Sequence, residues 1–243
     1  MREWAGKRYW LVGASQGLGR AVALELSKTG AEVILSARDE EALQQLSSEL
    51  PGKSSVVPVD VSDPASVAQA AEAAGDLDGM VFLAGLYWPL PATEFDGEKV
   101  ATMLDVNLTG AARVLGHVLP PMVEKDAGHI VLTGSLSGFR GLPGANGYGA
   151  SKAGIMSLAE TLYADLRKTG IDVQLINPGF IKTRLTDKND FTMPFIMEPE
   201  DAAKLFVDHM QDDEFARNFP RYFGALFRLS QFLPDWLYYR LFR

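Results

Sequence analysis

The chain has 243 residues, 47% of them hydrophobic, no cysteine and a formal net charge of −8 at pH 7. This length and apolar content favour one domain with a sizeable core. The composition excludes a disulfide framework, thiol catalysis and a Cys-ligated metal, and the negative charge argues against a general nucleic-acid binder.

Targeting and metal signals are weak. Residues 1–15 are charged where a secretory signal needs an apolar core, and the apolar run 79–92 is too short to span a bilayer. The histidines, His117, His129 and His209, lie far apart and have no metal-ligand spacing. We expect a cytoplasmic protein, at most peripheral to a membrane, without a metal site.

Apolar runs alternate with helical patterns along most of the chain. The strand-like runs cover residues 8–15, 32–37, 54–59, 79–85, 128–135 and 171–179. The helical patterns cover residues 17–28, 39–50, 64–74, 96–118 and 148–168, the fourth being ended by Pro120 and Pro121.

Repeated strand and helix units require right-handed crossovers. The pattern therefore predicts an α/β Rossmann fold, in which a doubly wound, mostly parallel sheet of about seven strands has helices on both faces. We expect one nucleotide-binding catalytic domain over residues 1–218 and an aromatic, arginine-rich extension over residues 219–243.

Ligands of such sheets bind beyond the carboxyl ends of the strands. At the first of these ends the sequence reads GASQGLG. Its glycines allow a tight turn and close approach of backbone to a diphosphate, and the following helix start favours an anion. The residues expected to hold a dinucleotide are Gly13, Ser15, Gln16, Gly17, Leu18 and Gly19.

The end of the second strand bears on the choice of coenzyme. Ala37 stands where a carboxylate would bind the ribose hydroxyls, and Arg38 follows it. An arginine pairs with a 2′-phosphate, so the sequence favours NADP(H) over NAD(H). In the alternative, Arg38 is a surface residue paired with Asp39 or Glu40.

A tyrosine and a lysine stand one helical turn apart in the stretch YGASK. Residues at i and i+4 share a helix face, so Tyr148 and Lys152 can point into the same space. A nearby ammonium would lower the pKa of the phenol and allow it to exchange protons near neutral pH. The alternative is an ordinary surface pair.

Six motifs follow one another in a characteristic order: the glycine loop, DVS at 60–62, NLTG at 107–110, TGSLSG at 133–138, YGASK at 148–152 and NPGFIKT at 177–183. In this the chain resembles the classical short-chain dehydrogenase/reductase family over about residues 8–205. One departure is that Phe82 and Leu83 occupy positions where the family usually has asparagines.

The resemblance implies an enzyme that acts on CH–OH donors with NAD(P)⁺, and a catalytic group of Asn107, Ser135, Tyr148 and Lys152. Tyr148 would donate a proton to the substrate oxygen as hydride arrives, and Ser135 would hydrogen-bond that oxygen. Lys152 would lower the tyrosine pKa and hold the nicotinamide ribose, and Asn107 would position a water. The alternatives are a mid-helix structural role for Asn107 and a turn role for Ser135.

The resemblance also implies further coenzyme contacts. Two residues would touch the adenine, two would line the channel and four would close over the nicotinamide. They are, in that order, Asp60 and Val61, Ala84 and Gly85, and Pro178, Gly179, Ile181 and Thr183. Thr183 could instead only cap the next segment.

The segments expected at the substrate are 86–91, 139–146 and a mobile lid over 183–197. Their aromatic and apolar residues suit an apolar ketone or secondary alcohol. An alternative enzyme is a reductase of 3-oxoacyl thioesters, and an alternative from another class is a non-catalytic NADP(H)-sensing module.

The C-terminal stretch 219–243 holds four arginines, one aspartate and nine of the 24 aromatics. It departs from the family, which commonly ends in a last strand and a glycine-rich tail; we expect the departure after about Gln211. The tail could pack on the body or on a second subunit, wall the substrate mouth, or lie on a membrane surface. The resemblance implies a homodimer or homotetramer.

Overall fold

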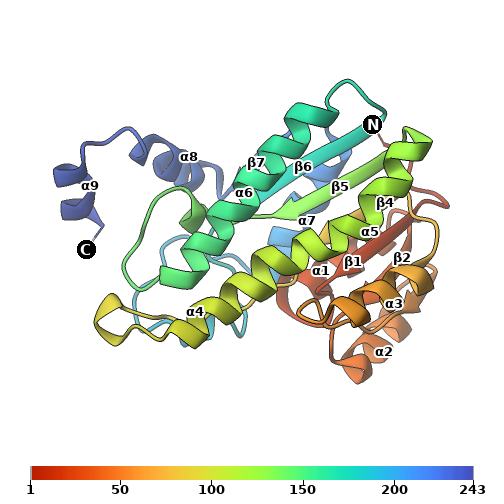
Figure 1. Cartoon of the computed structure of the whole chain (residues 1–243), viewed down its shortest axis with the longest axis horizontal. Coiled ribbons are helices and arrows are strands. Elements are labelled where there is room, and N and C mark those ends of the chain that lie inside the picture. The colour runs from red at the N-terminus through yellow and green to blue at the C-terminus, as the bar shows by residue number, and fades with distance from the viewer. Residues whose placement is uncertain (1, 243) are drawn as a thin grey trace.

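The computed structural model describes residues 2–242 and contains one sheet of seven parallel strands in the order β3-β2-β1-β4-β5-β6-β7 (Figure 1). The strands are β1 (Arg8–Val12), β2 (Glu32–Ser36), β3 (Ser54–Val56), β4 (Gly79–Phe82), β5 (Gly128–Thr133), β6 (Ile171–Pro178) and β7 (Ala216–Phe219). The predicted doubly wound α/β fold is confirmed.

Helices cover both faces of this sheet (Figure 1). They are α1 (Gly17–Ser27), α2 (Glu40–Glu49), α3 (Pro64–Ala74), α4 (Gly97–Leu104), α5 (Gly110–Lys125), α6 (Asn146–Leu166), α7 (Pro199–Gln211), α8 (Arg221–Ser230) and α9 (Asp235–Leu241). Side chains of β1 alternate between two cores, because successive strand residues point to opposite faces. Leu11 joins the core under α1, α2 and α7, whereas Trp10 and Val12 join the core under α3, α5 and α6.

Two aspartates cap helices close to the carboxyl edge of the sheet. The Asp39 carboxylate accepts from the backbone N–H of Ala42 at 3.1 Å and begins α2. Asp63 accepts from the N–H of Ala65 at 2.9 Å, with Pro64 in the first turn of α3. Each carboxylate satisfies one of the N–H groups that a helix start leaves unpaired.

The expectation that Pro120 and Pro121 end a helix is wrong. Both lie inside α5, which continues to Lys125 and ends at Asp126, in the left-handed conformation with φ 46°. The turn beyond the prolines carries Met122, which is 2% exposed and packs in the core under α5. Tertiary packing of this residue outweighs the local helix-breaking tendency of proline.

The expected departure from the family after Gln211 is also partly wrong, because a last strand follows α7. This strand, β7, pairs in parallel with β6 through residues 175–178. It carries little sequence signal, since Phe219 is its only buried side chain and Arg217 and Asn218 are polar. Tail helices then begin at Arg221; that the segment 219–243 differs from the family's usual end stays a prediction.

A buried polar chain crosses the sheet. The Tyr9 hydroxyl lies 2.9 Å from His129 Nδ1, and Nε2 of the same ring lies 2.9 Å from Gln174 Oε1. Gln174 donates from its amide nitrogen to three backbone carbonyls, one in the last turn of α7 and two in the turn that follows it. Because Gln174 Oε1 can only accept, His129 carries its proton on Nε2 and accepts from Tyr9. The imidazole is thus neutral, and burial lowers its pKa to about 3.

Acid should destabilise the protein through this histidine. In the unfolded chain the pKa of His129 is near 6.5, so below that pH the unfolded state binds a proton that the folded state does not bind. The stability that the neutral ring contributes falls as the pH drops from about 6.5 toward 3, by at most about 1.4 kcal/mol per pH unit.

The measurement is urea unfolding of the wild type and His129→Gln between pH 7.5 and 4.5. The variant is expected to be less stable at pH 7.5, and its deficit should shrink as the pH falls. Two stability curves that stay parallel would contradict the buried, neutral histidine.

Candidate active site

A cavity of about 1110 Å³ opens beyond the carboxyl ends of the strands. It is lined by every residue predicted to contact the coenzyme, together with Ser135. These residues are Gly13, Ser15, Gln16, Gly17, Leu18, Gly19, Arg38, Asp60, Val61, Ala84, Gly85, Tyr148, Lys152, Pro178, Gly179, Ile181 and Thr183. The structure therefore brings residues from both halves of the chain to one site.

The glycine loop is built on very close backbone contacts. Gly13 has φ +102°, and a side chain there would place Cβ 2.4 Å from the backbone nitrogen of Ala84. A Cβ on Gly19 would lie 2.0 Å from the Gly13 carbonyl oxygen. Only glycine fits at these two positions, so the loop can hold the first turn of α1 against the cavity with its N–H groups free to meet an anion.

The substitution Gly19→Ala should therefore abolish coenzyme binding and lower the unfolding temperature, since the clash is with backbone. Gly116→Ala is the matched control, because this exposed helical glycine has nothing within 4 Å of the added Cβ. The control should gain about 0.5–1 kcal/mol of stability. Coenzyme titration and thermal unfolding measure both effects; unchanged binding by Gly19→Ala would contradict the tight loop.

Arg38 lines the cavity beyond the end of β2 and is exposed. Within residues 2–242 Arg38 forms no ion pair, so the alternative, a surface pair with Asp39 or Glu40, is wrong. The Asp39 carboxylate instead caps α2. Across the cavity, hydrogen bonds from Ser62 lower the pKa of Asp60, helped by the charge of Arg38. The guanidinium is thus available to an anionic ligand.

Lys152 places a buried ammonium at the floor of the site. The side chain is 4% exposed, and Nζ donates to the Thr133 carbonyl at the end of β5 over 2.8 Å. Burial lowers the pKa of Lys152 to about 8. At pH 7 the group is still mostly cationic, and it supplies positive charge at the point where β5 ends.

Tyr148 does not have the lowered pKa that we expected. Burial raises the pKa of Tyr148 to about 12; a hydrogen bond with the Ser135 side chain acts in the opposite direction, and Tyr87 raises the pKa further. Lys152 Nζ lies 5.7 Å from the centre of the phenol ring and donates to Thr133 instead of the phenol oxygen. In this geometry Tyr148 is a neutral phenol that carries its proton at pH 7.

The Ser135 hydroxyl is a hydrogen-bond donor next to Tyr148, whose pKa it lowers. Its Oγ accepts from the backbone N–H of Ser137 at 3.2 Å and from the Ser137 hydroxyl at 2.9 Å. With its lone pairs so engaged, the Ser135 hydroxyl is oriented to donate to another acceptor in the cavity. Sequence reasoning missed Ser137, although its place two residues after Ser135, in a serine-rich turn, was a usable signal.

Asn107 lies in a π-helical turn (Asp105–Thr109) between α4 and α5, a distortion often found at functional sites. Its Oδ1 accepts from the Leu86 N–H at 2.6 Å, and Nδ2 donates to the Leu86 carbonyl and to the Ser151 hydroxyl, both at 2.9 Å. The side chain is a clamp on the loop after β4. Its predicted role in positioning a water stays a prediction.

The segment after β6 folds back over the cavity. The Thr186 hydroxyl accepts from the Thr183 N–H at 2.9 Å and donates to the Ile181 carbonyl. The side chain that caps this segment is therefore that of Thr186, and not that of Thr183 as in the alternative role. The Thr183 side chain packs against Gly17 of the glycine loop. It thereby joins the two rims of the coenzyme site.

The same segment is tied to the loop after β4. The Tyr87 hydroxyl donates to Asn189 Oδ1 at 2.8 Å, and Lys188 donates to the Tyr87 carbonyl at 2.8 Å. The Tyr87 ring meets Tyr148 edge-on, with centroids 5.0 Å apart. Leu86, Trp88 and Leu185 line the cavity beside this contact, which gives the region next to Tyr148 an apolar wall.

Part of the segment expected at the substrate meets the tail instead. Phe139 and Leu142 pack against a cluster formed by Leu136, Phe223 and Phe227. Of the roles weighed for the tail, packing on the body of the same chain is the one these contacts display. The cluster begins one residue after Ser135, so the tail braces one edge of the site.

One group of metal-ligand side chains occurs among residues 2–242. Ligand atoms of His209, Asp212 and Glu214 lie within 4.8 Å of one another. Arg217 pairs with both carboxylates, and its charge and burial lower the pKa of His209, burial being the larger effect. A guanidinium already holds the cation position, which disfavours a metal ion.

Comparison with known proteins agrees with this site. The family model for short chain dehydrogenase matches residues 7–193. An uncharacterized oxidoreductase of Myxococcus xanthus is 39% identical over 245 residues, covering 98% of this chain and 97% of the relative.

Two solved structures extend the comparison. A variant of actinorhodin polyketide ketoreductase with NADPH is 26% identical, with a TM-score of 0.80 over 90% of this chain and 97% of that chain. A 7β-hydroxysteroid dehydrogenase has a TM-score of 0.85 over 99% of this chain and 98% of that chain; at 23% identity it shows the fold alone.

The chain therefore belongs to the short-chain dehydrogenase family, as its six motifs predicted. This is a family of oxidoreductases with an NAD(P)-binding Rossmann fold. No helix within residues 2–242 is both long enough and apolar enough to cross a membrane. The cytoplasmic location stays a prediction.

Proposed function

We propose that the protein is an NADPH-dependent carbonyl reductase that interconverts an apolar ketone and a secondary alcohol. The observation that carries the proposal is the pair of hydroxyls at the cavity floor: Ser135, whose Oγ accepts two hydrogen bonds from Ser137 and so acts as a donor, and Tyr148, protonated at pH 7. Both belong to the lining of one cavity with Lys152. A ketone oxygen placed between them would meet two donors.

When bound, the coenzyme supplies the hydride that reduces the carbonyl carbon. The residues of this chain act on the oxygen. The Ser135 hydroxyl donates a hydrogen bond to it and stabilises the negative charge that develops there. Tyr148 then transfers its proton to the oxygen and completes the alcohol.

Proton transfer in this direction is favourable. The phenol of Tyr148 has a pKa of about 12 and is still a stronger acid than an alcohol, because an alkoxide resembles hydroxide in basicity. The phenolate left on Tyr148 has the Lys152 ammonium 5.7 Å from its ring centre, and an opposite charge at that range stabilises it. In the oxidative direction the phenolate accepts the proton back.

The preference for NADPH rests on Arg38. Ala37 removes the carboxylate that would repel a 2′-phosphate, Asp39 is held at the start of α2, and the Arg38 guanidinium is exposed at the cavity. An arginine fork matches a phosphate through charge-assisted hydrogen bonds. The apolar wall of Leu86 and Trp88 supports a substrate without many hydroxyls.

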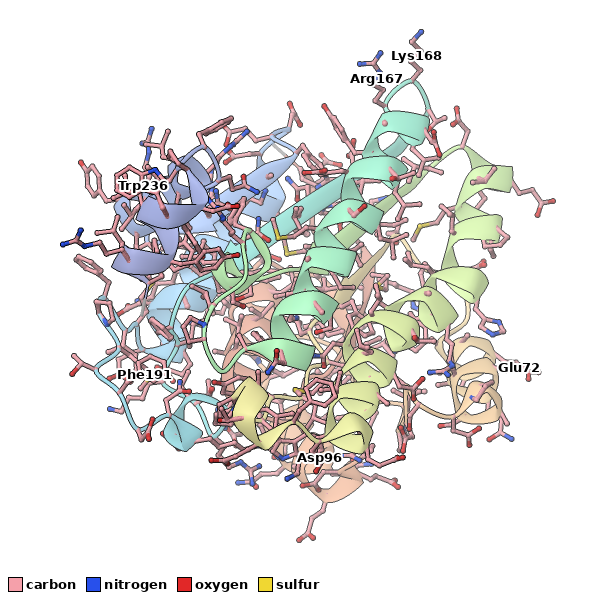
Figure 2. The ribbon with its side chains drawn as sticks, turned by 60° about the vertical axis from the view of Figure 1, so that its left-hand side comes forward. Glu72, Asp96, Arg167, Lys168, Phe191 and Trp236 are labelled. Carbon is pink, nitrogen blue, oxygen red and sulfur yellow. The ribbon has the colours of Figure 1, made fainter. Side chains whose placement is uncertain are left out.

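Replacing Arg38 tests the coenzyme assignment. Arg38→Asp should weaken NADPH binding on the order of 10- to 100-fold, the effect of one or two lost hydrogen bonds to a charged group, and leave NADH binding nearly unchanged. Arg167→Asp makes the same charge change at the C-terminal end of α6, outside the cavity lining, and is the control; Arg167 is labelled in Figure 2. Equal losses for both coenzymes in Arg38→Asp would refute the preference.

Replacing Tyr148 tests the reaction. NADPH consumption is followed with cyclic, aryl and long-chain ketones. Tyr148→Phe should keep coenzyme binding and lose at least about 100-fold in turnover, the usual contribution of a proton donor. Tyr163→Phe, on the exposed side of the same helix α6, should behave as wild type. Tight NADPH binding without turnover of any ketone would favour a coenzyme-sensing module instead.

Assembly remains a proposal as well. Family members are typically oligomeric, and we propose a homodimer or homotetramer for this chain on that resemblance.

A further inference from the structure

The tail helices α8 and α9 turn an apolar face to solvent. Phe223 and Phe227 point inward from α8, whereas Tyr222 on the opposite side is 90% exposed. Farther along, Phe232 is 83% and Trp236 is 70% exposed. We call the outward side chains the C-terminal face: Arg221, Tyr222, Leu226, Arg228, Leu229, Phe232, Trp236, Tyr239, Arg240 and Leu241.

Exposed apolar residues are concentrated there. Of thirteen large apolar side chains exposed within residues 2–242, seven belong to the C-terminal face and three more, Phe191, Phe195 and Ile196, to the segment over the cavity. The Phe195 ring contacts the Phe223 ring, with centroids 5.4 Å apart, so this segment adjoins α8. Figure 2 shows Phe191 and Trp236 on the same side of the molecule. Patches of this kind mark interaction sites.

The body of the protein holds the face in a fixed orientation. Arg140 donates to the Ser230 carbonyl at 2.9 Å, pairs with the Asp235 carboxylate and lies 4.0 Å from the centre of the Tyr238 ring. The Tyr238 hydroxyl donates to the Gly141 carbonyl at 2.9 Å. The exposure of the apolar side chains is therefore a feature of a docked segment and not of a loose end.

The charge of this face opposes that of the rest of the chain. Residues 219–243 carry four arginines and one aspartate, a local charge of +3. Because the whole chain has a net charge of −8, the other residues together carry −11. Within residues 2–242, Arg221, Arg228 and Arg240 form no ion pair, and Asp235, the only acid of the tail, is engaged by Arg140. Three cations thus stand among exposed aromatics without counter-ions.

We propose that the C-terminal face docks on the surface of an anionic phospholipid bilayer. Tryptophan and tyrosine place an apolar ring and a polar edge at the boundary between headgroups and acyl chains, and arginines reach the phosphates while their stems stay in apolar surroundings. The acidic remainder of the protein is repelled by the same headgroups, which orients the molecule with this face down.

The arginines decide between a bilayer and a second copy of the chain. A two-fold contact brings the same patch of both subunits together. It would bring the unpaired arginines of both tails into one interface, and the part of the tail that the structure describes has no unpaired acid to neutralise them, because Asp235 is already paired with Arg140. A bilayer supplies the missing phosphates. The proposal rests on the tail alone and is independent of the proposed activity.

Flotation of the full chain with vesicles tests the proposal. The wild type should float with vesicles of equimolar phosphatidylcholine and phosphatidylglycerol, less at high salt, and weakly with phosphatidylcholine alone. A triple variant, Arg221→Gln, Arg228→Gln and Arg240→Gln, should partition on the order of 100-fold more weakly, because each basic residue contributes roughly fivefold. A double variant, Phe232→Ser and Trp236→Ser, should also lose binding.

The control is Phe95→Ser, which removes a 60% exposed aromatic outside the tail and should float as wild type does. Far-UV circular dichroism and unfolding temperature check that each variant is folded. Failure of the wild type to float with anionic vesicles overturns the proposal. If that failure comes with a change of oligomeric state in Phe232→Ser, Trp236→Ser by sedimentation velocity, a second copy covers the face.

Discussion

The site depends on one buried interaction, the hydrogen bond from Lys152 Nζ to the Thr133 carbonyl. Removing an ammonium from water is costly, and its lowered pKa of about 8 expresses that cost. The charge can be held there because β5 ends at Thr133, whose backbone carbonyl accepts from Nζ at 2.8 Å. Tyr148 is carried one helical turn before this lysine.

Interactions elsewhere in the fold offset the free-energy cost of burying the Lys152 ammonium. Two apolar cores fill the space on either side of the sheet, and the chain of Tyr9, His129 and Gln174 satisfies polar groups far from the cavity. Around the cavity itself, loops are fixed by side-chain clamps: Asn107 on the loop after β4 and Arg140 on the tail. Rigid scaffold and positioned loops are the usual division of labour in a doubly wound sheet.

Sequence reasoning predicted the fold, and it named residues that the structure brings to one cavity, because glycine loops, apolar strands and family motifs are local signals. It failed where a distant contact decides the outcome. Met122 carries α5 past two prolines, and β7 forms from polar residues because β6 offers an edge to pair with. The pKa of Tyr148 could not be read from its spacing to Lys152, since burial has the largest effect on it and Lys152 donates to the Thr133 carbonyl. Ser137 and Ser151 were missed because their roles exist only through Ser135 and Asn107.

The central claim of the proposal is that the hydroxyls of Ser135 and Tyr148 donate to the oxygen of a ketone while hydride reaches the carbonyl carbon. The most direct measurement uses NADPH with deuterium at the hydride position of the nicotinamide and follows the label by mass spectrometry of the alcohol product. The account predicts one deuterium on the carbinol carbon with the wild type and none above background with Tyr148→Phe, at equal coenzyme occupancy. Saturated enzyme that transfers no deuterium to any ketone, or transfer that Tyr148→Phe leaves unchanged, would contradict it.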